Sequence, residues 1–348
     1  MVIKADGAPR LKGMTFARAA IAVALAEGSK SAASEIAAAR WGATSPATAY
    51  LKSAVGAGTS DTWRPESSPY SASAEFFAAA FERSIAGRLA GLRRVPFLTR
   101  MVNLADATQA SWVAEGAAVP ISAAALDFSA LPPLKVAAMT VCTLEALRET
   151  SGLAEATLRA DLLRAVTDAL DAAFLDPTNA GVPDAKPASI TNGAPSTDMS
   201  STWDAEDLVY ALVDGFEGDL ASAVVAVNPK TAALLHSPLK LPNLGARGGD
   251  VAGIPAVVSR GMPLGEVALI DPLGIAYAGG SGEIKVSTEA TVEMDDAPTA
   301  DATTPTATQS VSLWQSHAAA LGCSAFANWR TIREGYVTRV MTPVTGAS

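Results

Sequence analysis

Apolar side chains recur with helical spacing across residues 153–176. The spacing of four residues places them in one stripe along a helix, made of Leu158, Leu162, Val166, Leu170 and Phe174. Ser151 is a suitable N-cap, and Asp176 followed by Pro177 ends the pattern. At ~1.5 Å per residue the stretch predicts a helix about 36 Å long. Its apolar stripe is predicted to be the structural core of the helix, packed against a sheet or another layer.

The pattern before this helix changes from helical to extended. Ala-rich residues 14–41 predict one or two helices, whereas residues 42–69 carry Gly, Ser, Thr and Pro without periodicity and predict an extended arm. A hairpin is predicted over residues 109–133, because limbs at 111–114 and 126–130 flank a tip of small residues. The remaining predicted elements are a helix over 72–92, a β-prone run at 95–102, a strand at 134–142 and a short helix at 144–149.

Shorter elements follow the long helix. The 24 residues of 179–202 are rich in Pro, Ser, Thr and Asn, which predicts a surface insertion because packed connections are shorter. Two long strands are predicted at 282–294 and 309–321, on either side of an acidic loop at 295–308. The other predicted elements are helices over 203–216 and 229–236, and strands at 223–227, 254–259, 267–270, 274–278 and 325–330.

Composition restricts the classes of protein to which the chain can belong. A chain of 348 residues exceeds one compact core and predicts two lobes or one elaborated domain. The net charge of −9, with no basic run of five residues, argues against a basic groove for nucleic acid. Cys142 and Cys323 lie in apolar stretches far apart in sequence, which predicts free thiols and a reducing compartment. No apolar run approaches the ~18 residues of a membrane span.

The N-terminus contains a pattern that is similar to a signal peptide. Basic residues precede an apolar run of eight residues at 19–26, which ends in small side chains. Arg18 lies directly before this run, and a helical pattern continues after it. We therefore favour an ordinary N-terminal helix and keep secretion as the alternative.

The sequence contains no constellation that predicts catalytic, cofactor-binding or metal-binding residues. His236 and His317 have no cysteine, histidine or carboxylate at metal-ligand spacing. Neither a GxSxG nucleophile elbow nor a GxxxxGK[ST] phosphate loop occurs, and the Gly-rich residues 279–282 lie between predicted strands. Asp295 and Asp296 are interpreted as a charged surface tip. An α+β enzyme without a recognisable motif is the alternative from another functional class.

Seven short motifs occur in an order that is typical of one protein family. In chain order they are W-x-x-E at Trp112 and Glu115, the aromatic Phe128, Lys135-Val136, TLEALRETS at 143–151, VVAVNP at 224–229, GIPAVVSRGMP at 253–263 and FANWR at 326–330. Each motif consists of a few common residues, and their shared order carries the signal. Over roughly residues 70–340 the chain resembles the major capsid protein of tailed bacteriophages.

This resemblance implies an α+β fold, the tailed-phage major capsid fold, and a structural function. The protein is expected to self-assemble into the icosahedral shell that encloses the double-stranded DNA genome of a tailed phage or prophage. In the family's terms, the first implied parts are N-terminal helices and an extended N-arm at 1–70, a segment leading into the peripheral (P) domain at 71–108, and an E-loop hairpin at 109–133. The P domain is implied at 134–200 and 283–322, with a spine helix at 153–176. The axial (A) domain is implied at 201–282 and 323–348.

The resemblance also implies contacts and partners. The expected assembly contacts are Trp112, Glu115, Pro120 and Phe128 on the E-loop over a neighbouring subunit, and Asp295 and Asp296 on the P-domain arm that meets other capsomers. The expected partners are further copies of the chain in pentamers and hexamers, together with a scaffolding protein, a portal, a maturation protease and nonspecifically packaged DNA. No cofactor or membrane is expected, and the protein would be assembled in the host cytoplasm and reside in the virion. Residues 14–41 are expected to be held by another subunit or by the inside of the shell.

The sequence departs from the family in two places. Some relatives join their subunits by a Lys–Asn isopeptide bond, whose lysine lies just before the E-loop proline. Here Val119 precedes Pro120, so this cross-link is not expected. Many relatives carry a long charged scaffolding segment that a protease removes, whereas residues 1–41 are short and Ala-rich. The same fold also builds encapsulin compartments, which are cellular cargo shells, and the sequence alone leaves that alternative open.

Overall fold

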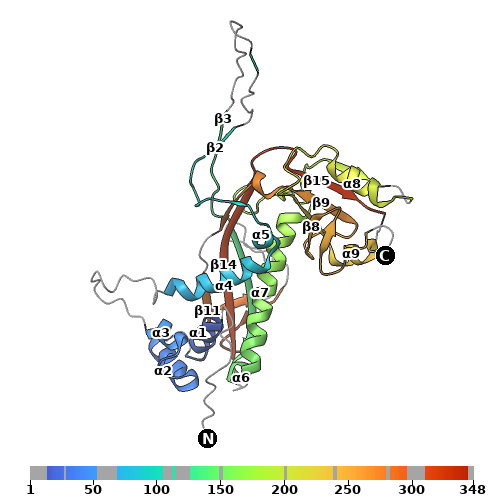
Figure 1. The fold of residues 1–348 in the computed structure, drawn as a ribbon. Helices are drawn as coiled ribbons and strands as arrows, with labels where there is room; N and C mark the ends of the chain where they lie inside the picture. The colour runs from blue at the N-terminus through green and yellow to red at the C-terminus, as the bar shows by residue number, and fades with distance from the viewer. Residues whose placement is uncertain are drawn as a thin grey trace. The chain divides into compact units, whose positions relative to one another are not determined.

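The chain folds into two compact units in the computed structural model (Figure 1). The described residues are 14–26, 29–52, 69–104, 112–113, 126–148, 152–199, 202–237, 241–279, 283–295 and 310–343. Unit 1 comprises Met1–Phe81, Val136–Thr167 and Ser281–Ala325, and unit 2 comprises Glu82–Lys135, Asp168–Gly280 and Phe326–Ser348. Helix α7 (Gly152–Leu175) and strand β14 (Ala318–Thr331) begin in unit 1 and end in unit 2. Both units combine helices with paired strands, in agreement with the predicted α+β class.

Unit 1 contains most of the N-terminal helices and the strands on either side of the acidic loop at 295–308. Its helices besides α7 are α1 (Met14–Leu25), α2 (Lys30–Trp41), α3 (Pro46–Lys52), α4 (Pro69–Arg83) and α6 (Leu144–Arg148). Its strands besides β14 are β4 (Lys135–Thr143), β11 (Glu283–Ser287), β12 (Thr291–Glu293) and β13 (Ser310–Ser312). Strand β11 pairs antiparallel with residues 320–324 of β14, and β4 also pairs with β14. Strands β12 and β13 form a separate two-stranded ribbon.

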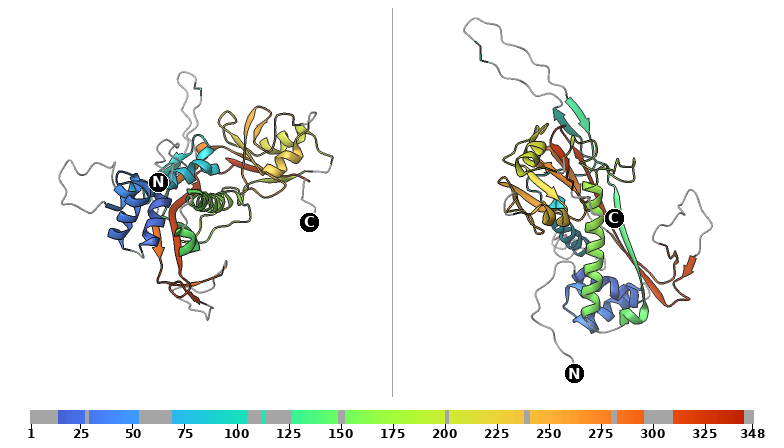
Figure 2. Two further views of the ribbon diagram at one scale, coloured as in Figure 1. Left: turned by 90° about the horizontal axis from the view of Figure 1, so that it is seen from below. Right: turned by 90° about the vertical axis from the view of Figure 1, so that its right-hand side faces the viewer.

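Helix α1 is a core helix of unit 1. Its small side chains permit close approach of neighbouring elements, and its buried residues are Phe16, Ala17, Ala19, Ala20, Ile21, Ala22 and Ala24. One side packs against α6 and β14 through Ala20, Ile21 and Ala24, and another packs against α2 through Ala22. Figure 2 shows α1, α2 and α3 gathered beside α6 and the first turns of α7. These helices therefore pack within their own unit. The expected contact of residues 14–41 with another subunit or with the inside of the shell stays a prediction.

The predicted extended arm at 42–69 is wrong in its first part, where α3 forms. Ser45 starts this helix by accepting a hydrogen bond from the backbone N of Thr48 at 3.2 Å. Pro46 occupies the first helical position, where its missing N–H costs nothing. Residues 53–68 lie outside the described part of the chain.

The single helix predicted over 72–92 is divided into α4 and α5 (Ile85–Arg88). The division falls at Ser84, whose backbone is extended and whose side chain accepts a hydrogen bond from Gly87 N at 3.3 Å. A serine hydroxyl at this position caps a new helix instead of continuing the old one. The apolar spacing continues across the break, which is why periodicity does not reveal it.

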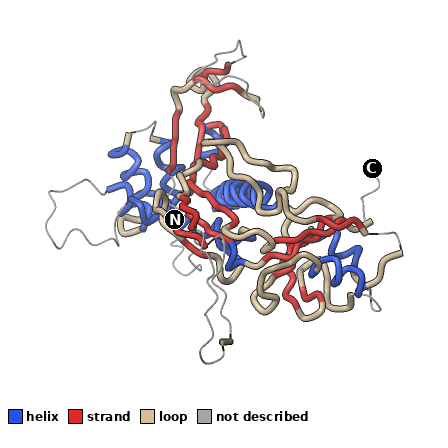
Figure 3. Tube along the Cα trace, turned by 90° about the horizontal axis from the view of Figure 1, so that it is seen from above, coloured by secondary structure: helices blue, strands red, loops and turns tan. Residues whose placement is uncertain are grey.

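A six-stranded sheet forms the core of unit 2. Its strands follow the order β5 (Ser196–Asp198), β15 (Val337–Met341), β9 (Glu266–Ile270), β6 (Val224–Val227), β8 (Ile254–Val258) and β7 (Gly249–Val251). Strands β9 and β6 are buried along their whole length, in keeping with their nearly continuous apolar sequences. Helices α8 (Ala205–Val213) and α9 (Pro229–Leu235) join this core through Leu208, Leu212 and Leu235 (Figure 3).

Unit 2 also contains the stem of the predicted hairpin. Strand β1 (Arg93–Arg94) pairs in parallel with β10 (Ile275–Gly279), and β10 pairs antiparallel with β14. Strands β2 (Met101–Leu104) and β3 (Leu126–Ser129) form the antiparallel stem. The outgoing limb is thus 101–104 and not the predicted 111–114. Met101 is buried, and its burial fixes which face of the ribbon points inward. The β-prone run at 95–102 is interrupted by a turn at Leu98, whose φ is 59°.

The prediction of a surface insertion at 179–202 holds for most of the segment, which is exposed, and is wrong where the segment meets the end of α7. Asn179, Ser189, Ile190 and Thr191 are buried, and the segment ends in strand β5. Asn179, Ser189 and Thr191 are inside the protein because their side chains bond to backbone carbonyls at the end of α7, where unpaired oxygens would be costly.

The two long strands predicted near the C-terminus are each interrupted. Residues 288–290 separate β11 from β12, and turns at 313–317 separate β13 from β14. The strand predicted at 325–330 is the second half of β14, which runs unbroken through residues 318–331. Strands β5, β7 and β15 were not predicted; β5 and β7 have three residues each, which are too few for a clear periodic signal.

Candidate assembly surfaces

The predicted E-loop has a short stem whose base belongs to unit 2. Strands β2 and β3 pair over four residues each, and a two-stranded ribbon of this size is marginal in water. Its base is stabilised because Met101 and Leu131 pack with Ala276 and Ala278 of β10. Beyond the stem the described residues are Trp112 and Val113, and both are exposed.

The four predicted E-loop contacts fall in different positions. Trp112 lies beyond the stem, and its side chain is fully exposed in the single chain. Phe128 lies in β3 opposite Val102, with its side chain outside the described part. Glu115 and Pro120 lie outside the described residues. A fully exposed tryptophan is a large apolar surface that a partner can cover.

The predicted P-domain arm begins with the ribbon of β12 and β13. Val292 lies opposite Val311 in this ribbon, and Leu313 anchors it by packing with Ala318 and Ala320 of β14. Asp295 is exposed at the end of the described limb, and Asp296 lies outside the described residues. The ribbon therefore extends from β14 and carries the acidic segment.

Trp314 at the base of this ribbon is a surface residue that the sequence did not reveal. It is 72% exposed in the turn between β13 and β14, and Met294 on the opposite limb is also exposed. The turn is held by Ser312, which accepts a hydrogen bond from Gln315 N, and by His317, whose φ is 48°. The strand predicted at 309–321 includes Trp314, whose side chain would be expected to pack there. Only the interruption of that strand exposes it.

The stripe predicted on α7 faces the interior of both units. Leu162, Val166 and Phe174 are buried, with Val166 only 1% exposed, whereas Leu158 and Leu170 are half-buried. Leu158 packs in the unit 1 cluster that contains α1. Phe174 meets Trp329 of β14 edge to face in unit 2, with ring centroids 5.2 Å apart. Leu163 is also completely buried.

Asp171 joins α7 to two other segments of unit 2. Its side chain is buried and accepts hydrogen bonds from the backbone N of Ile85 at 2.8 Å and from Ser259 Oγ at 2.5 Å. Arg88 of α5 donates to Val258 O at 2.7 Å beside this contact. Burial raises the pKa of Asp171, and the two hydrogen bonds and Arg88 oppose that rise. Asp171 lies outside the apolar stripe predicted for this helix, and it is buried nonetheless.

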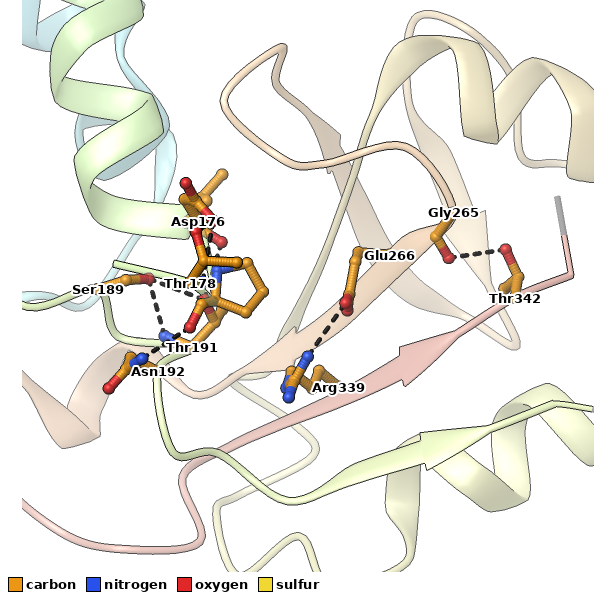
Figure 4. Close-up of polar contacts among 11 residues, drawn as sticks. Asp176, Thr178, Ser189, Thr191, Asn192, Gly265, Glu266, Arg339 and Thr342 are labelled. Carbon is orange, nitrogen blue, oxygen red and sulfur yellow. Dashed lines mark hydrogen bonds and ion pairs between the residues drawn. The ribbon is translucent and has the colours of Figure 1, made fainter. Parts of the chain in front are cut away.

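The end of α7 is capped by the segment that follows it (Figure 4). Ser189 Oγ donates to Phe174 O, and Thr191 Oγ1 donates to Leu175 O, each at 2.8 Å. Asn179 Nδ2 donates to Ala173 O at 2.8 Å. These bonds satisfy carbonyl groups that the helix leaves without an internal partner. The segment therefore fixes the direction in which the chain leaves α7.

A partly buried ion pair lies in the sheet of unit 2 (Figure 4). Arg339 of β15 donates from Nη1 to Glu266 Oε1 of β9 at 3.0 Å. Burial raises the pKa of Glu266, the charge of Arg339 and its hydrogen bond oppose the rise, and Asp198 and Asp176 add to it. The pair joins two adjacent strands near the edge where the sheet receives β5.

Helix α8 carries a further exposed aromatic side chain beside a groove. The capping box formed by Asp204 and Asp207 starts the helix, and Tyr210 is 74% exposed. The groove has a volume of about 780 Å³ and runs between Val209, Tyr210 and Val213 of α8 and the loop at 241–253. This surface belongs to the part of unit 2 that the resemblance assigns to the A domain.

The described ranges contain neither a metal-ligand cluster nor a membrane-spanning helix. No group of three or more His, Cys, Asp or Glu residues there could hold a metal ion. Cys142 and Cys323 are free thiols. None of the helices described is long and apolar enough to cross a membrane.

Comparison with known proteins identifies the family. Residues 73–311 match the phage capsid family. The capsid polyprotein of Pseudomonas phage PAJU2 is 33% identical over 264 residues, which cover 71% of this chain and 39% of that protein. The chain therefore spans about two-fifths of the length of this relative.

Solved structures show the same fold at low sequence identity. The structure from Gordonia phage Cozz matches 75% of this chain and 87% of its own, with 14% identity and a TM-score of 0.54. The structure from Mycobacterium phage Ogopogo matches 74% and 92%, with 16% identity and a TM-score of 0.52. The capsid of a native GTA particle matches 76% and 90%, with 15% identity and a TM-score of 0.51. Because the family match covers well over half of its residues, this chain belongs to the phage capsid family.

Proposed function

We propose that the chain assembles as pentamers and hexamers into a closed icosahedral shell that encloses the double-stranded DNA of a tailed phage or prophage. The observation that carries this proposal is a pair of two-stranded ribbons, each of which has an exposed tryptophan next to it in the sequence. Trp112 follows the stem of β2 and β3, and Trp314 lies at the base of β12 and β13. Ribbons of this kind are marginal alone and gain stability when a neighbouring surface covers their apolar residues.

We assign the E-loop role to the hairpin on β2 and β3. Its anchored base and exposed Trp112 support a loop that lies over a neighbouring subunit. Phe128, Glu115 and Pro120 complete the proposed contact. Tryptophan suits such a contact because it buries a large area with little loss of side-chain entropy.

We assign the arm that meets other capsomers to β12, β13 and the acidic segment between them. Asp295 and Asp296 are its proposed polar contacts, and Trp314 and Met294 are its proposed apolar ones. The charges favour approach of a basic surface and set orientation, whereas the apolar side chains supply most of the binding free energy.

The proposed domains follow the family's order. Unit 1 supplies most of the P domain, with α7 as its spine, and the strands and helices around β9 and β6 in unit 2 form the A domain. The N-terminal helices belong with the P domain, since they pack in unit 1. The groove beside Tyr210 is then an A-domain surface available to the next subunit in a ring.

The remaining partners are proposals from the same assignment. A scaffolding protein, a portal and a maturation protease would act during assembly in the host cytoplasm. DNA would be packaged nonspecifically, enclosed by the shell and not bound in a basic groove, because the net charge of the chain is −9. We assign a structural role and no catalytic one. Because Val119 stands where a cross-linking lysine would, denatured particles should run as single subunits on a gel.

Electron microscopy of the purified protein tests the proposal. Wild-type protein is expected to form closed shells of uniform size, and Trp314→Ala is expected to reduce shell yield at least tenfold. Gln315→Ala is the matched control, because Gln315 is the exposed neighbour of Trp314 in the same turn. Protein that stays monomeric under all conditions contradicts the shell. Particles that contain cargo protein and no DNA when isolated from cells would indicate an encapsulin-like compartment.

A further inference from the structure

Helices α1, α2 and α3 pack into unit 1 through side chains that are completely buried. Phe16 is 1% exposed, and its ring stacks on Phe76 of α4 with centroids 4.2 Å apart. Phe77 meets Phe16 edge to face at 6.4 Å. Ile21 packs beside this cluster against α6 and β14. The contact has the composition of a protein core, with aromatic and aliphatic side chains and little polar surface.

A polar contact fixes the orientation of the same helices. Arg40 of α2 donates from Nη1 to Leu147 O and from Nη2 to Arg148 O, both at 3.1 Å. These carbonyls lie at the end of α6, where a helix leaves its oxygens without internal partners. The guanidinium group is planar and presents parallel donors, so it satisfies two carbonyls at once. Its carbon also lies 5.8 Å from the centre of the Trp41 ring, which restricts its position.

We propose that α1, α2 and α3 form a cap that stays bound to unit 1 after the chain is cut between α3 and α4. Residues 53–68 connect these two helices in sequence. A short connection contributes an effective concentration on the order of millimolar, whereas the buried contact supplies the affinity. Dissociation of the cap would expose Phe76, Phe77 and the apolar side chains of α6 and β14 to water, which opposes release.

If the cap stays bound, a cut in residues 53–68 does not remove α1, α2 and α3 from the subunit. A protease acting there would shorten the main polypeptide and yet leave α1, α2 and α3 in place. A subunit mass that begins near residue 60 would then report a broken chain and not lost helices. The proposal concerns the single subunit and does not depend on shell assembly.

A protease site inserted within residues 53–68 of the full-length chain tests the proposal. After cleavage, denaturing electrophoresis should show two pieces. Size-exclusion chromatography of the same sample at micromolar concentration should show one species that contains both pieces in equal amounts. Elution of the N-terminal piece by itself would overturn the proposal. So would a large piece that keeps its circular dichroism spectrum and solubility after the small piece has been removed.

Variants of the cut protein show whether the buried contact holds the cap. Phe16→Ala should raise the dissociation constant of the cap about 100-fold or more, because it empties a completely buried site. Arg40→Ala should raise it about tenfold by removing two hydrogen bonds to carbonyls. Glu35→Ala is the matched control, since Glu35 lies exposed on α2, and it should leave the constant unchanged. Equal dissociation constants for all three variants would overturn the proposal.

Discussion

Asp171 of α7 accepts a hydrogen bond from the hydroxyl of Ser259, 2.5 Å away in space and 88 positions later in sequence. The same carboxylate caps α5 by accepting from Ile85 N. Gly261 lies so close that a Cβ there would come within 2.3 Å of the Asp171 carbonyl carbon. One buried carboxylate thus links the second half of α7, the start of α5 and the loop after β8.

The first prediction concerns the pH dependence of this joint. Asp171→Asn keeps the size of the side chain and removes its ionisation. Burial raises the pKa of Asp171, so the folded state favours the protonated form. Stability from this group is complete below the ordinary carboxyl pKa of about 3.9 and is lost as the pH rises through the raised value. The free energy of unfolding of the wild type, relative to Asp171→Asn, should therefore fall as the pH increases from about 4.

Urea denaturation of the unassembled subunit at several pH values measures this difference. Asp168→Asn is the control, because Asp168 lies exposed on the same helix. A difference between wild type and Asp171→Asn that is constant with pH would contradict the prediction, as would one that grows with pH.

The second prediction concerns the core face of α7. Val166→Asp should lower the free energy of unfolding by about 3–5 kcal/mol, because it removes packing and buries an unpaired carboxylate. Leu162→Asp should behave in the same way, since Leu162 is also buried. Ala165→Asp introduces the same side chain at the exposed neighbouring position and should have little effect. Soluble Asp variants at 162 and 166 with normal melting temperatures would show that this face is not a core.

The third prediction concerns the cap at the end of α7. Thr191→Val keeps the shape of the side chain but leaves Leu175 O without its 2.8 Å hydrogen bond. The free energy of unfolding should fall by about 1–3 kcal/mol, the cost of an unsatisfied buried carbonyl. Thr197→Val makes the same change at an exposed position in β5 and should be nearly neutral. Equal stability of the two variants would mean that the buried hydroxyl contributes nothing.

The fourth prediction concerns the distal hairpin. Deletion of residues 115–125 removes two of the proposed contacts and leaves the pairing of β2 with β3 intact. The variant should keep the circular dichroism spectrum and melting temperature of the wild-type subunit, because the base is anchored separately by Met101 and Leu131. It should not form closed shells in negative-stain images. Particles identical to those of the wild type would rule out an intersubunit clamp.

Several features of this protein can be predicted from its amino-acid sequence alone. The four-residue spacing from Leu158 to Phe174 predicts α7 almost to the residue, since periodicity reports a helix with one buried side. The helix predicted over 229–236 is α9, where Asn228 caps the first turn and Pro229 takes the first helical position, because capping depends on neighbouring residues alone. The order of seven short motifs indicated the phage capsid family, which the comparisons confirm.

Other features depend on partners that are distant in sequence, and only the tertiary structure decided them. Ser189 and Thr191 look like surface residues until the carbonyls of α7 are found beside them. Trp314 looks like a strand residue until the turn before β14 exposes it. The spacing of apolar residues shows that α1 has something to bury, but the same Ala-rich face can pack against its own unit or another subunit. The local pattern of apolar residues determines which face of a segment is buried. Which surface covers that face is decided only when the whole chain folds.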